Sequence, residues 1–229
     1  MVYVTGDTHR DFDRISDFCT KYGTTKDDVL IILGDVSINY FLDSRDRELK
    51  KYLSGLEITL LCVHGNHEER PFMIDTYRER KWQDGVVYCE EEFPTLLFAK
   101  DGEIYDLEGK KAIALGGAYS VDKQYRISSG APWFPAEQPS QDIMDHAEEM
   151  LNKIDWHIDV VLSHTAPLKY EPTDSFSPNV DQGLVDKTTE RWLDGIEDRL
   201  DYERWYCGHY HCSRKIDRVK IMFENYTVL

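Results

Sequence analysis

Five short clusters of histidine, aspartate and asparagine stand out in the chain. They are Gly6-Asp7-Thr8-His9, Gly34-Asp35, Gly65-Asn66-His67-Glu68, Ser163-His164 and Gly208-His209-Tyr210-His211. Imidazole nitrogens, carboxylate oxygens and amide oxygens are all ligands of divalent transition-metal ions. If the five clusters converge in space, they can build one polynuclear metal site.

Each cluster follows a short apolar run that predicts a β-strand. The runs are Val2–Thr5, Val29–Leu33, Ile58–Val63, Val160–Leu162 and Trp205–Cys207. In open α/β sheets, ligands bind outside the carboxyl ends of the strands, so clusters in this position can share one crevice. A glycine at or next to the end of four of these strands lets the backbone turn sharply and bring a ligand close.

Amphipathic stretches between these runs predict helices. They cover Phe12–Tyr22, which Gly23 ends, Leu49–Leu56, Ile143–Ile154 after a Ser140 cap, and about 186–200. Several short apolar runs between Val86 and Leu115 predict antiparallel strands. The segments 131–139 and 165–180 show neither a helical nor a strand-like hydrophobic period, which is typical of long functional loops. This alternation predicts an α/β protein, and the absence of a linker predicts a single domain over residues 1–229.

The chain is strongly acidic, because its 229 residues include 27 Lys+Arg against 43 Asp+Glu, a net charge of −16. Strong non-specific nucleic-acid binding is therefore excluded, since it depends on cations that neutralise the phosphate backbone. Five scattered cysteines show no disulfide pattern, and neither a signal peptide nor a membrane-length apolar run is visible. We expect a cytoplasmic protein without membrane association, and the sequence identifies no protein partner.

The ordered set of clusters resembles the calcineurin-like metallophosphoesterase family. That family carries Asp-x-His, Gly-Asp, Gly-Asn-His-Asp/Glu, a later His and Gly-His-x-His, and the match here runs from residue 6 to residue 211. The resemblance implies a fold of two mixed β-sheets flanked by helices. It also implies hydrolysis of phosphomonoesters or phosphodiesters, with nucleotide-like esters among the candidates, through attack by a hydroxide that bridges two metal ions.

The resemblance carries over residue by residue to two metal sites that share Asp35. One ion is expected on Asp7, His9, Asp35 and His211, and the other on Asp35, Asn66, His164 and His209. The resemblance also makes His67 the catalytic histidine, which stabilises the transition state or protonates the leaving oxygen. Arg10, next to His9, is predicted to contact the phosphate of a small phosphoester substrate, because a guanidinium pairs well with phosphate oxygens.

The donor chemistry of this ligand set indicates the metals. Imidazole, carboxylate and amide ligands without thiolate suit Mn, Fe, Zn, Co or Ni and suit Ca less well, and we favour manganese among them. Two divalent ions bring a charge of +4 and the two aspartates −2, so the pocket keeps about two positive charges. An acidic protein can thereby bind an anionic ester in one place.

The second cluster departs from the pattern of the protein Ser/Thr phosphatases in this superfamily. Those enzymes read Gly-Asp-x-x-Asp-Arg-Gly, whereas this chain lacks the second Asp and the Arg in Gly34–Tyr40. Phosphoprotein substrates are therefore disfavoured, and the partner of His67 is left open. Glu68 is adjacent in sequence, which does not show that it reaches His67.

Several other residues have two interpretations. The segment 116–134, with Tyr119, Lys123, Tyr125, Arg126 and Trp133, is either a substrate wall or an ordinary loop packed on the domain. His64 is expected to be structural, His146 and His157 to lie at the surface, and Ser163 to orient His164.

Two other functions compete with phosphoester hydrolysis. A non-catalytic scaffold of the same fold would be expected to lose ligands or the catalytic histidine, and this chain has lost neither. A nuclease would use the same metal-dependent hydrolysis, although the net charge of −16 restricts its substrates to short nucleic acids.

Overall fold

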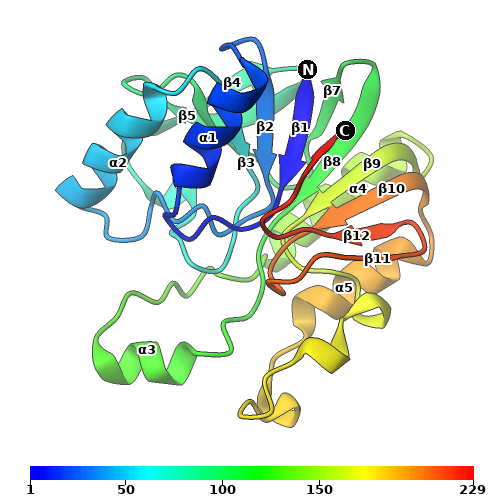
Figure 1. Ribbon diagram of the computed structural model, residues 1–229. Coiled ribbons are helices and arrows are strands. Elements are labelled where there is room, and N and C mark those ends of the chain that lie inside the picture. Colours follow the sequence, from blue (N-terminus) through cyan, green and yellow to red (C-terminus); the bar gives the residue numbers. More distant parts are fainter.

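The computed structural model describes residues 1–229 and contains two β-sheets that pack face to face, with helices on their outer sides (Figure 1). The first sheet has the strand order β13-β1-β2-β3-β6-β5-β4. Its strands are β1 (Val2–Thr5), β2 (Val29–Ile32), β3 (Thr59–Cys62), β4 (Tyr77–Trp82), β5 (Gly85–Glu90), β6 (Leu96–Ala99) and β13 (Tyr226–Val228).

The second sheet has the order β11-β12-β10-β9-β8-β7. Its strands are β7 (Ile104–Leu107), β8 (Lys110–Leu115), β9 (His157–Ser163), β10 (Asp201–Cys207), β11 (Arg214–Ile216) and β12 (Val219–Ile221). The helices are α1 (Asp13–Tyr22), α2 (Ser44–Ser54), α3 (Lys123–Ser129), α4 (Gln141–Lys153) and α5 (Thr188–Glu197). Both sheets are mixed, which confirms the fold class expected from the sequence.

The central strands of each sheet run parallel to one another. In the first sheet β1, β2, β3 and β6 are parallel neighbours, and in the second β8, β9, β10 and β12 are. The carboxyl ends of β1, β2 and β3 lie at one end of the first sheet, and those of β9 and β10 lie at one end of the second. These two ends meet, because the His209 amide after β10 donates to the Asp7 carboxylate after β1. This is the end at which the five polar clusters leave their strands.

The continuous apolar run of β2 is explained by burial of both of its faces. Leu30 and Ile32 pack outward against α1 and α2, in a cluster with Ile15 and Leu53. Ile31, on the opposite face, packs into the core between the sheets. A third apolar cluster joins the second sheet to α4 and α5. Both sheets are thus held by apolar layers on each side.

Most predicted elements are confirmed, including two helix boundaries. Gly23 ends α1 in the left-handed conformation with φ 60°, and the Ser140 side chain caps α4 by accepting from the Ile143 amide. The prediction of antiparallel strands between Val86 and Leu115 holds for the pairs β5–β6 and β7–β8. It is wrong for the other contacts of β6 and β8, which pair parallel with β3 and β9.

One α-helix and three strands were not predicted from the sequence: α3, β4, β11 and β13. Strand β4 reads Tyr-Arg-Glu-Arg-Lys-Trp and lies at the edge of its sheet, where one exposed face tolerates charge, so its apolar signal is weak.

All five cysteines are free, and no helix reaches the length and apolar character needed to span a membrane. The single domain over 1–229 stays a prediction.

Candidate metal centre

The sharp turns after the strands are what bring the five clusters together. Gly34 has φ +93°, and a Cβ at this position would overlap the imidazole of His164, from the other sheet. A Cβ at Gly208 would likewise overlap the carboxylate of Asp7. Glycine is therefore needed at both positions, because ligands from the two sheets approach its backbone directly.

The first group of ligands comprises Asp7, His9 and His211, whose donor atoms face one another. The Nε2 atoms of His9 and His211 lie 2.8 Å apart. Asp7 Oδ2 lies 3.7 Å from His9 Nε2 and 3.4 Å from His211 Nε2. Asp7 Oδ2 is buried and has no hydrogen-bond partner, while Oδ1 accepts from the His209 amide at 2.9 Å. A buried oxygen without a partner, beside two imidazole nitrogens, fits a cation.

The second group is built around His164, which is completely buried. Its Nδ1 donates to the Leu33 carbonyl at 2.8 Å, so its Nε2 carries a lone pair in the neutral ring. That Nε2 lies 2.9 Å from Asn66 Oδ1, while the Asn66 amide nitrogen donates to Ser120. Two acceptors thus face each other, which again fits a cation between protein ligands.

The fourth member of the second group is His209, whose ring centroid lies 5.0 Å from that of His164. Burial lowers the pKa of His209 to about 3, which keeps its imidazole neutral and able to bind a metal ion.

Asp35 lies between the two groups. Its Oδ2 lies 3.7 Å from His9 Nε2, in the first group. Its Oδ1 lies 3.6 Å from His164 Nε2, in the second group, and accepts a hydrogen bond from the His67 amide at 2.8 Å. Burial acts to raise the pKa of Asp35, but the imidazoles of His164, His67 and His9 together hold that pKa below its usual value. A carboxylate held ionised between two donor groups is placed to serve both of them.

The backbone of the site is strained. Four residues of the ligand set have positive φ, namely His9 at 44°, Asp35 at 46°, His209 at 69° and His211 at 48°. Such conformations cost energy and persist where the surrounding structure enforces them, frequently at functional sites. The structure therefore brings all seven predicted metal ligands together, and their donor chemistry fits divalent cations.

The comparisons with known proteins agree with this geometry. The sequence model of the calcineurin-like phosphoesterases matches residues 1–213. The chain belongs to the calcineurin-like phosphoesterase family. The match spans nearly the whole chain and includes all five ligand clusters.

Solved structures share the fold of this family member at low sequence identity. One is the crystal structure of TT1561 from Thermus thermophilus, with a TM-score of 0.53 and 10% identity over 97% of this chain and 87% of that one. A second crystal structure has a TM-score of 0.51 and 11% identity, over 96% of this chain and 88% of the other. No curated protein matches the chain significantly.

In this member of the family, the partner of His67 is an arginine from another part of the chain. The Glu68 carboxylate points elsewhere and accepts from the amides of Ser37 and Gly65, at 3.0 and 3.2 Å. Nη2 of Arg126 instead lies 2.8 Å from His67 Nε2 and also contacts Nδ1. The sequence places Arg126 only in a candidate substrate wall, because no local spacing links α3 to the third cluster.

The structure places Arg10 beside α2. Its guanidinium donates to the Asp46 carboxylate at 2.6 Å and to the Ser37 carbonyl at 2.7 Å, and it lies 4.9 Å from the centre of the Phe41 ring. These contacts occupy the guanidinium on the side of α2. Contact of Arg10 with a phosphate stays a prediction.

The remaining polar residues near the clusters have structural roles. The Ser163 hydroxyl donates to the Thr165 carbonyl at 2.6 Å and accepts from Trp205, so its predicted role in orienting His164 is wrong. The Leu33 carbonyl orients that ring instead. His157 is exposed and pairs with Asp201, which confirms its surface assignment.

A cavity of about 360 Å³ opens beside the metal ligands. Its lining includes Asp35, His67, His209, Tyr119 and residues of the segment between β9 and α5. Trp133 is not among the lining residues, and its indole donates to Glu137 at 2.8 Å while Lys123 lies over its ring. The wall interpretation therefore gains support at Tyr119, and the ordinary-loop interpretation at Trp133.

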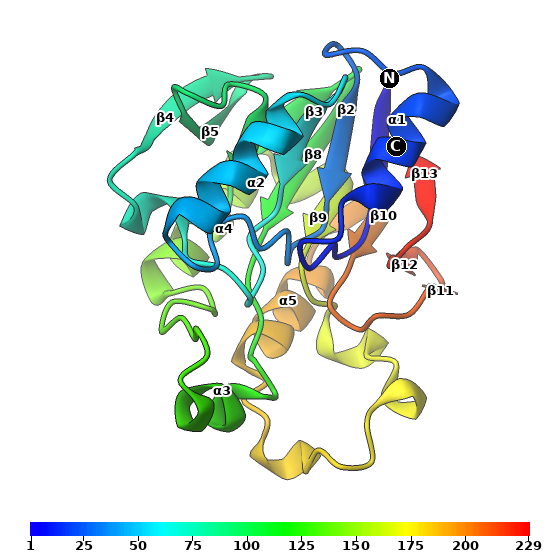
Figure 2. The ribbon, with the colours of Figure 1, turned by 60° about the vertical axis from the view of Figure 1, so that its left-hand side comes forward.

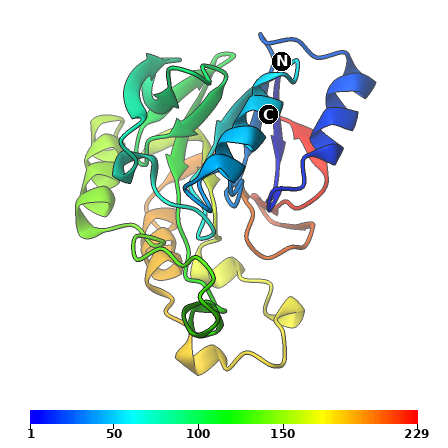
Figure 3. The same ribbon diagram turned by 90° about the vertical axis from the view of Figure 1, so that its left-hand side faces the viewer.

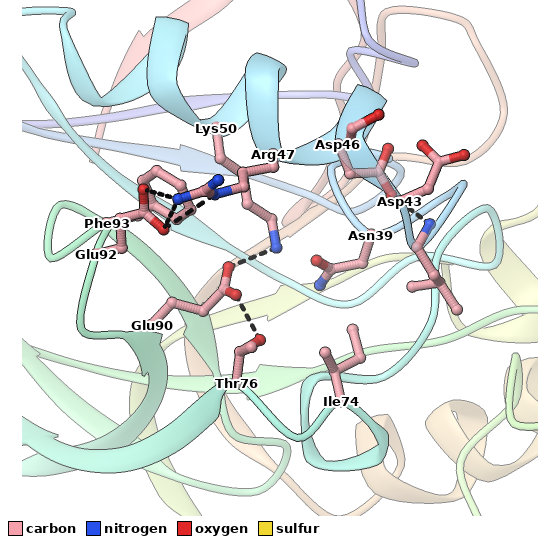
Figure 4. A pocket seen from close by; sticks show the side chains of 12 residues that line it. Asn39, Asp43, Asp46, Arg47, Lys50, Ile74, Thr76, Glu90, Glu92 and Phe93 are labelled. Carbon is pink, nitrogen blue, oxygen red and sulfur yellow. Dashed lines mark hydrogen bonds and ion pairs between the residues drawn. The ribbon is translucent and has the colours of Figure 1, made fainter.

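A larger cavity of about 430 Å³ lies away from the metal ligands, between α2 and the strand pair β4–β5 (Figure 4). Its charged side chains pair with one another, since Lys50 binds Glu90 at 2.5 Å and Arg47 binds Glu92 at 2.9 Å. No group of metal donors includes these residues, whereas Asp35, His67 and His211, which belong to such groups, line the smaller cavity.

Proposed function

We propose that this protein is a hydrolase of small phosphoric esters that uses two divalent transition-metal ions, with manganese favoured. The observation that carries the proposal is the convergence of the seven ligands, with the partnerless Asp7 Oδ2 and the facing acceptors of His164 and Asn66. Both features are costly in a protein without a cation and are explained by bound metal.

The two ions would share Asp35. Asp7, His9, Asp35 and His211 would hold one ion, and Asp35, Asn66, His164 and His209 the other. Bound ions supply Lewis-acid activation of the phosphoryl group and of water.

The protein side chains position the ester and manage its leaving oxygen. His67 lines the cavity, and its side chain is about one quarter exposed, so it can reach a bound ester. We assign to it the stabilisation or protonation of the leaving oxygen. Arg126 fixes the orientation of its ring through the contact at Nε2.

Substrate size and charge follow from the surface. A net charge of −16 disfavours long nucleic acids, while the metal centre supplies local positive charge. The missing Asp and Arg of the second cluster disfavour phosphoproteins. We therefore propose small mono- or diesters as substrates and, because all five thiols are free, the cytoplasm as the location.

The test is hydrolysis of p-nitrophenyl phosphate and bis-p-nitrophenyl phosphate by metal-stripped protein reconstituted with Mn, Fe, Zn or Co. We expect activity only with added metal, and its loss in Asp35→Asn. Asp145→Asn, on the exposed face of α4, is the matched control and should keep full activity. Full activity of the metal-free protein would refute the mechanism, and inactivity with every metal would favour the non-catalytic scaffold.

A further inference from the structure

Another cavity, of about 390 Å³, lies between the two sheets and apart from the metal ligands. Its lining comes from β13 in the first sheet and from β8 to β12 in the second. Figures 2 and 3 show β13, in red, well separated from α3, whose Arg126 contacts His67. None of the seven metal ligands lines this cavity. Its chemistry is therefore independent of the metal centre.

Four cationic side chains line this cavity, which we call the basic cavity: Lys110, Arg204, Lys215 and Lys220. None of the four forms an ion pair, whereas Arg214, next to Lys215, binds Asp174 at 2.6 Å. Glu203 is the acidic side chain of the lining. In a chain with 27 Lys+Arg against 43 Asp+Glu, four unpaired cations around one cavity are a strong local excess of positive charge.

The register of the second sheet places three of these cations on one face. Lys220 is paired with Tyr206 in β10 and with Lys215 in β11. Directly paired residues point to the same side of a sheet, and Tyr206 packs into the core between the sheets. Arg204, two residues before Tyr206, shares that side. Like charges directly opposite each other destabilise a sheet, so the pairing of Lys215 with Lys220 is costly without an anion.

Protection of the sheet edge explains only one of these cations. Lysines on edge strands prevent pairing with other chains, and Lys215 lies on the edge strand β11. Lys220 and Arg204 lie on β12 and β10, inside the sheet. Burial lowers the pKa of Lys220, and the positive charges of Arg204 and Lys215 lower it further. A bound anion would offset this repulsion by supplying the opposite charge.

The size and charge of the basic cavity favour a compact polyanion. A volume of about 390 Å³ lies in the range of small-molecule sites. A terminal phosphoryl group carries a charge of about −1.5 to −2 at neutral pH, so linked phosphoryl groups place more charge in a small volume than carboxylates do. Arginine pairs with phosphate oxygens through its planar fork, and lysine supplies point charges around them.

We propose that the basic cavity binds a small polyanion of linked phosphoryl groups, such as inorganic tripolyphosphate, through Arg204, Lys215 and Lys220. Lys110 adds a fourth positive charge from β8. The ligand is bound there and not hydrolysed, because the cavity contains no metal ligand. This site goes beyond the proposed phosphoesterase function and does not depend on it.

The experiment is calorimetric titration of the full-length, metal-stripped protein with tripolyphosphate, because tripolyphosphate would remove manganese from the loaded protein. We expect binding that weakens at least about tenfold in Lys220→Gln and in Arg204→Gln, since each loses a charge-assisted contact. Lys153→Gln removes an exposed lysine of α4 and is the matched control, which should bind as wild type. Inorganic phosphate and citrate should each bind the wild-type protein at least about tenfold more weakly than tripolyphosphate.

Thermal unfolding gives a second readout. Tripolyphosphate should raise the Tm of the wild-type protein but not that of Lys220→Gln, because only the former binds the ligand. Without ligand, Lys220→Gln should unfold at no lower temperature than wild type, since the substitution removes a repulsion between paired lysines. Arg204→Gln serves as the second variant if Lys220→Gln does not fold. Manganese-loaded Lys220→Gln should hydrolyse p-nitrophenyl phosphate at the wild-type rate.

Three results would overturn this proposal. If tripolyphosphate does not bind, or binds wild type and Lys220→Gln equally, the cations only protect the surface of the sheet. If citrate binds as tightly as tripolyphosphate, the site does not select phosphoryl groups. If the wild-type protein dimerises in sedimentation, and both Lys220→Gln and tripolyphosphate fail to change the dimer or each other's binding, the face belongs to an interface between copies of this acidic chain.

Discussion

The guanidinium of Arg126 lies against the imidazole of His67, with Nη2 2.8 Å from Nε2. Arg126 is itself held in place, because its Nε donates to Asp122 at 2.8 Å and its Nη1 to the Pro132 carbonyl at 3.1 Å. Its side chain is only 4% exposed. A buried cation from α3 thus lies beside the predicted catalytic histidine, in a chain whose second cluster lacks the arginine of the protein Ser/Thr phosphatases.

Removal of Arg126 should impair turnover more than binding. In Arg126→Ala we expect kcat for p-nitrophenyl phosphate to fall by about tenfold to a hundredfold, because a displaced His67 no longer meets the leaving oxygen. KM should change much less, since the metal centre still binds the phosphoryl group. Arg199→Ala, which removes a half-exposed arginine elsewhere, is the control. Unchanged kcat in Arg126→Ala would show that the contact has no catalytic consequence.

Metal binding should stabilise the folded protein. Because the ligands are assembled only in the native state, added Mn should raise Tm, and a chelator should lower it again. Calorimetric titration of the stripped protein should give two Mn per chain, and Asp35→Asn should weaken both sites because Asp35 lies between them. A titration that stops at one ion, or at none, would contradict the dinuclear assignment.

The close approach at Gly34 predicts a strong steric effect. Gly34→Ala adds the cost of a positive φ to an overlap with His164, and together these should lower the free energy of unfolding by about 2–5 kcal/mol. Gly109 is the matched control, since it has φ +85° but no atom within 4 Å of the position that a Cβ would take. Gly109→Ala should therefore cost only about 1–2 kcal/mol in urea unfolding. Similar losses for both variants would remove the steric argument.

The buried Glu190 should make stability depend on pH. Burial, together with the negative charge of Glu171, raises the pKa of its carboxyl above the usual value. The hydrogen bond from Thr165 and the positive charge of Lys187 lower this pKa, but by less than burial raises it. The unfolded chain ionises first as pH rises, so wild-type stability falls from about pH 4.5 up to the raised pKa and then levels off. Glu190→Gln lacks this loss, and its stability relative to wild type should grow as pH rises above about 4.5 and level off above the raised pKa, as measured by urea unfolding. A difference that is independent of pH would contradict the raised pKa.

The ligand clusters and their strands were predictable because their signals are local. A buried strand such as Val29–Leu33 is a continuous apolar run, and the Gly-Asp that follows it marks the turn. The parallel arrangement then brings residues as distant as Asp7 and His211 to one end of the sheets. The fold class and the assembly of the seven ligands thus followed from the sequence pattern and the family resemblance.

Only the tertiary structure decided which groups surround those ligands. The His67–Arg126 contact joins residues on separate elements, and α3 itself has no clear apolar period. The Leu33 carbonyl, rather than the neighbouring Ser163, orients His164, because that ring crosses from the second sheet to the first. The burial of Glu190 likewise depends on the packing of α5. Such contacts depend on how elements pack against one another, and neither the period nor the spacing of a single chain segment records that packing.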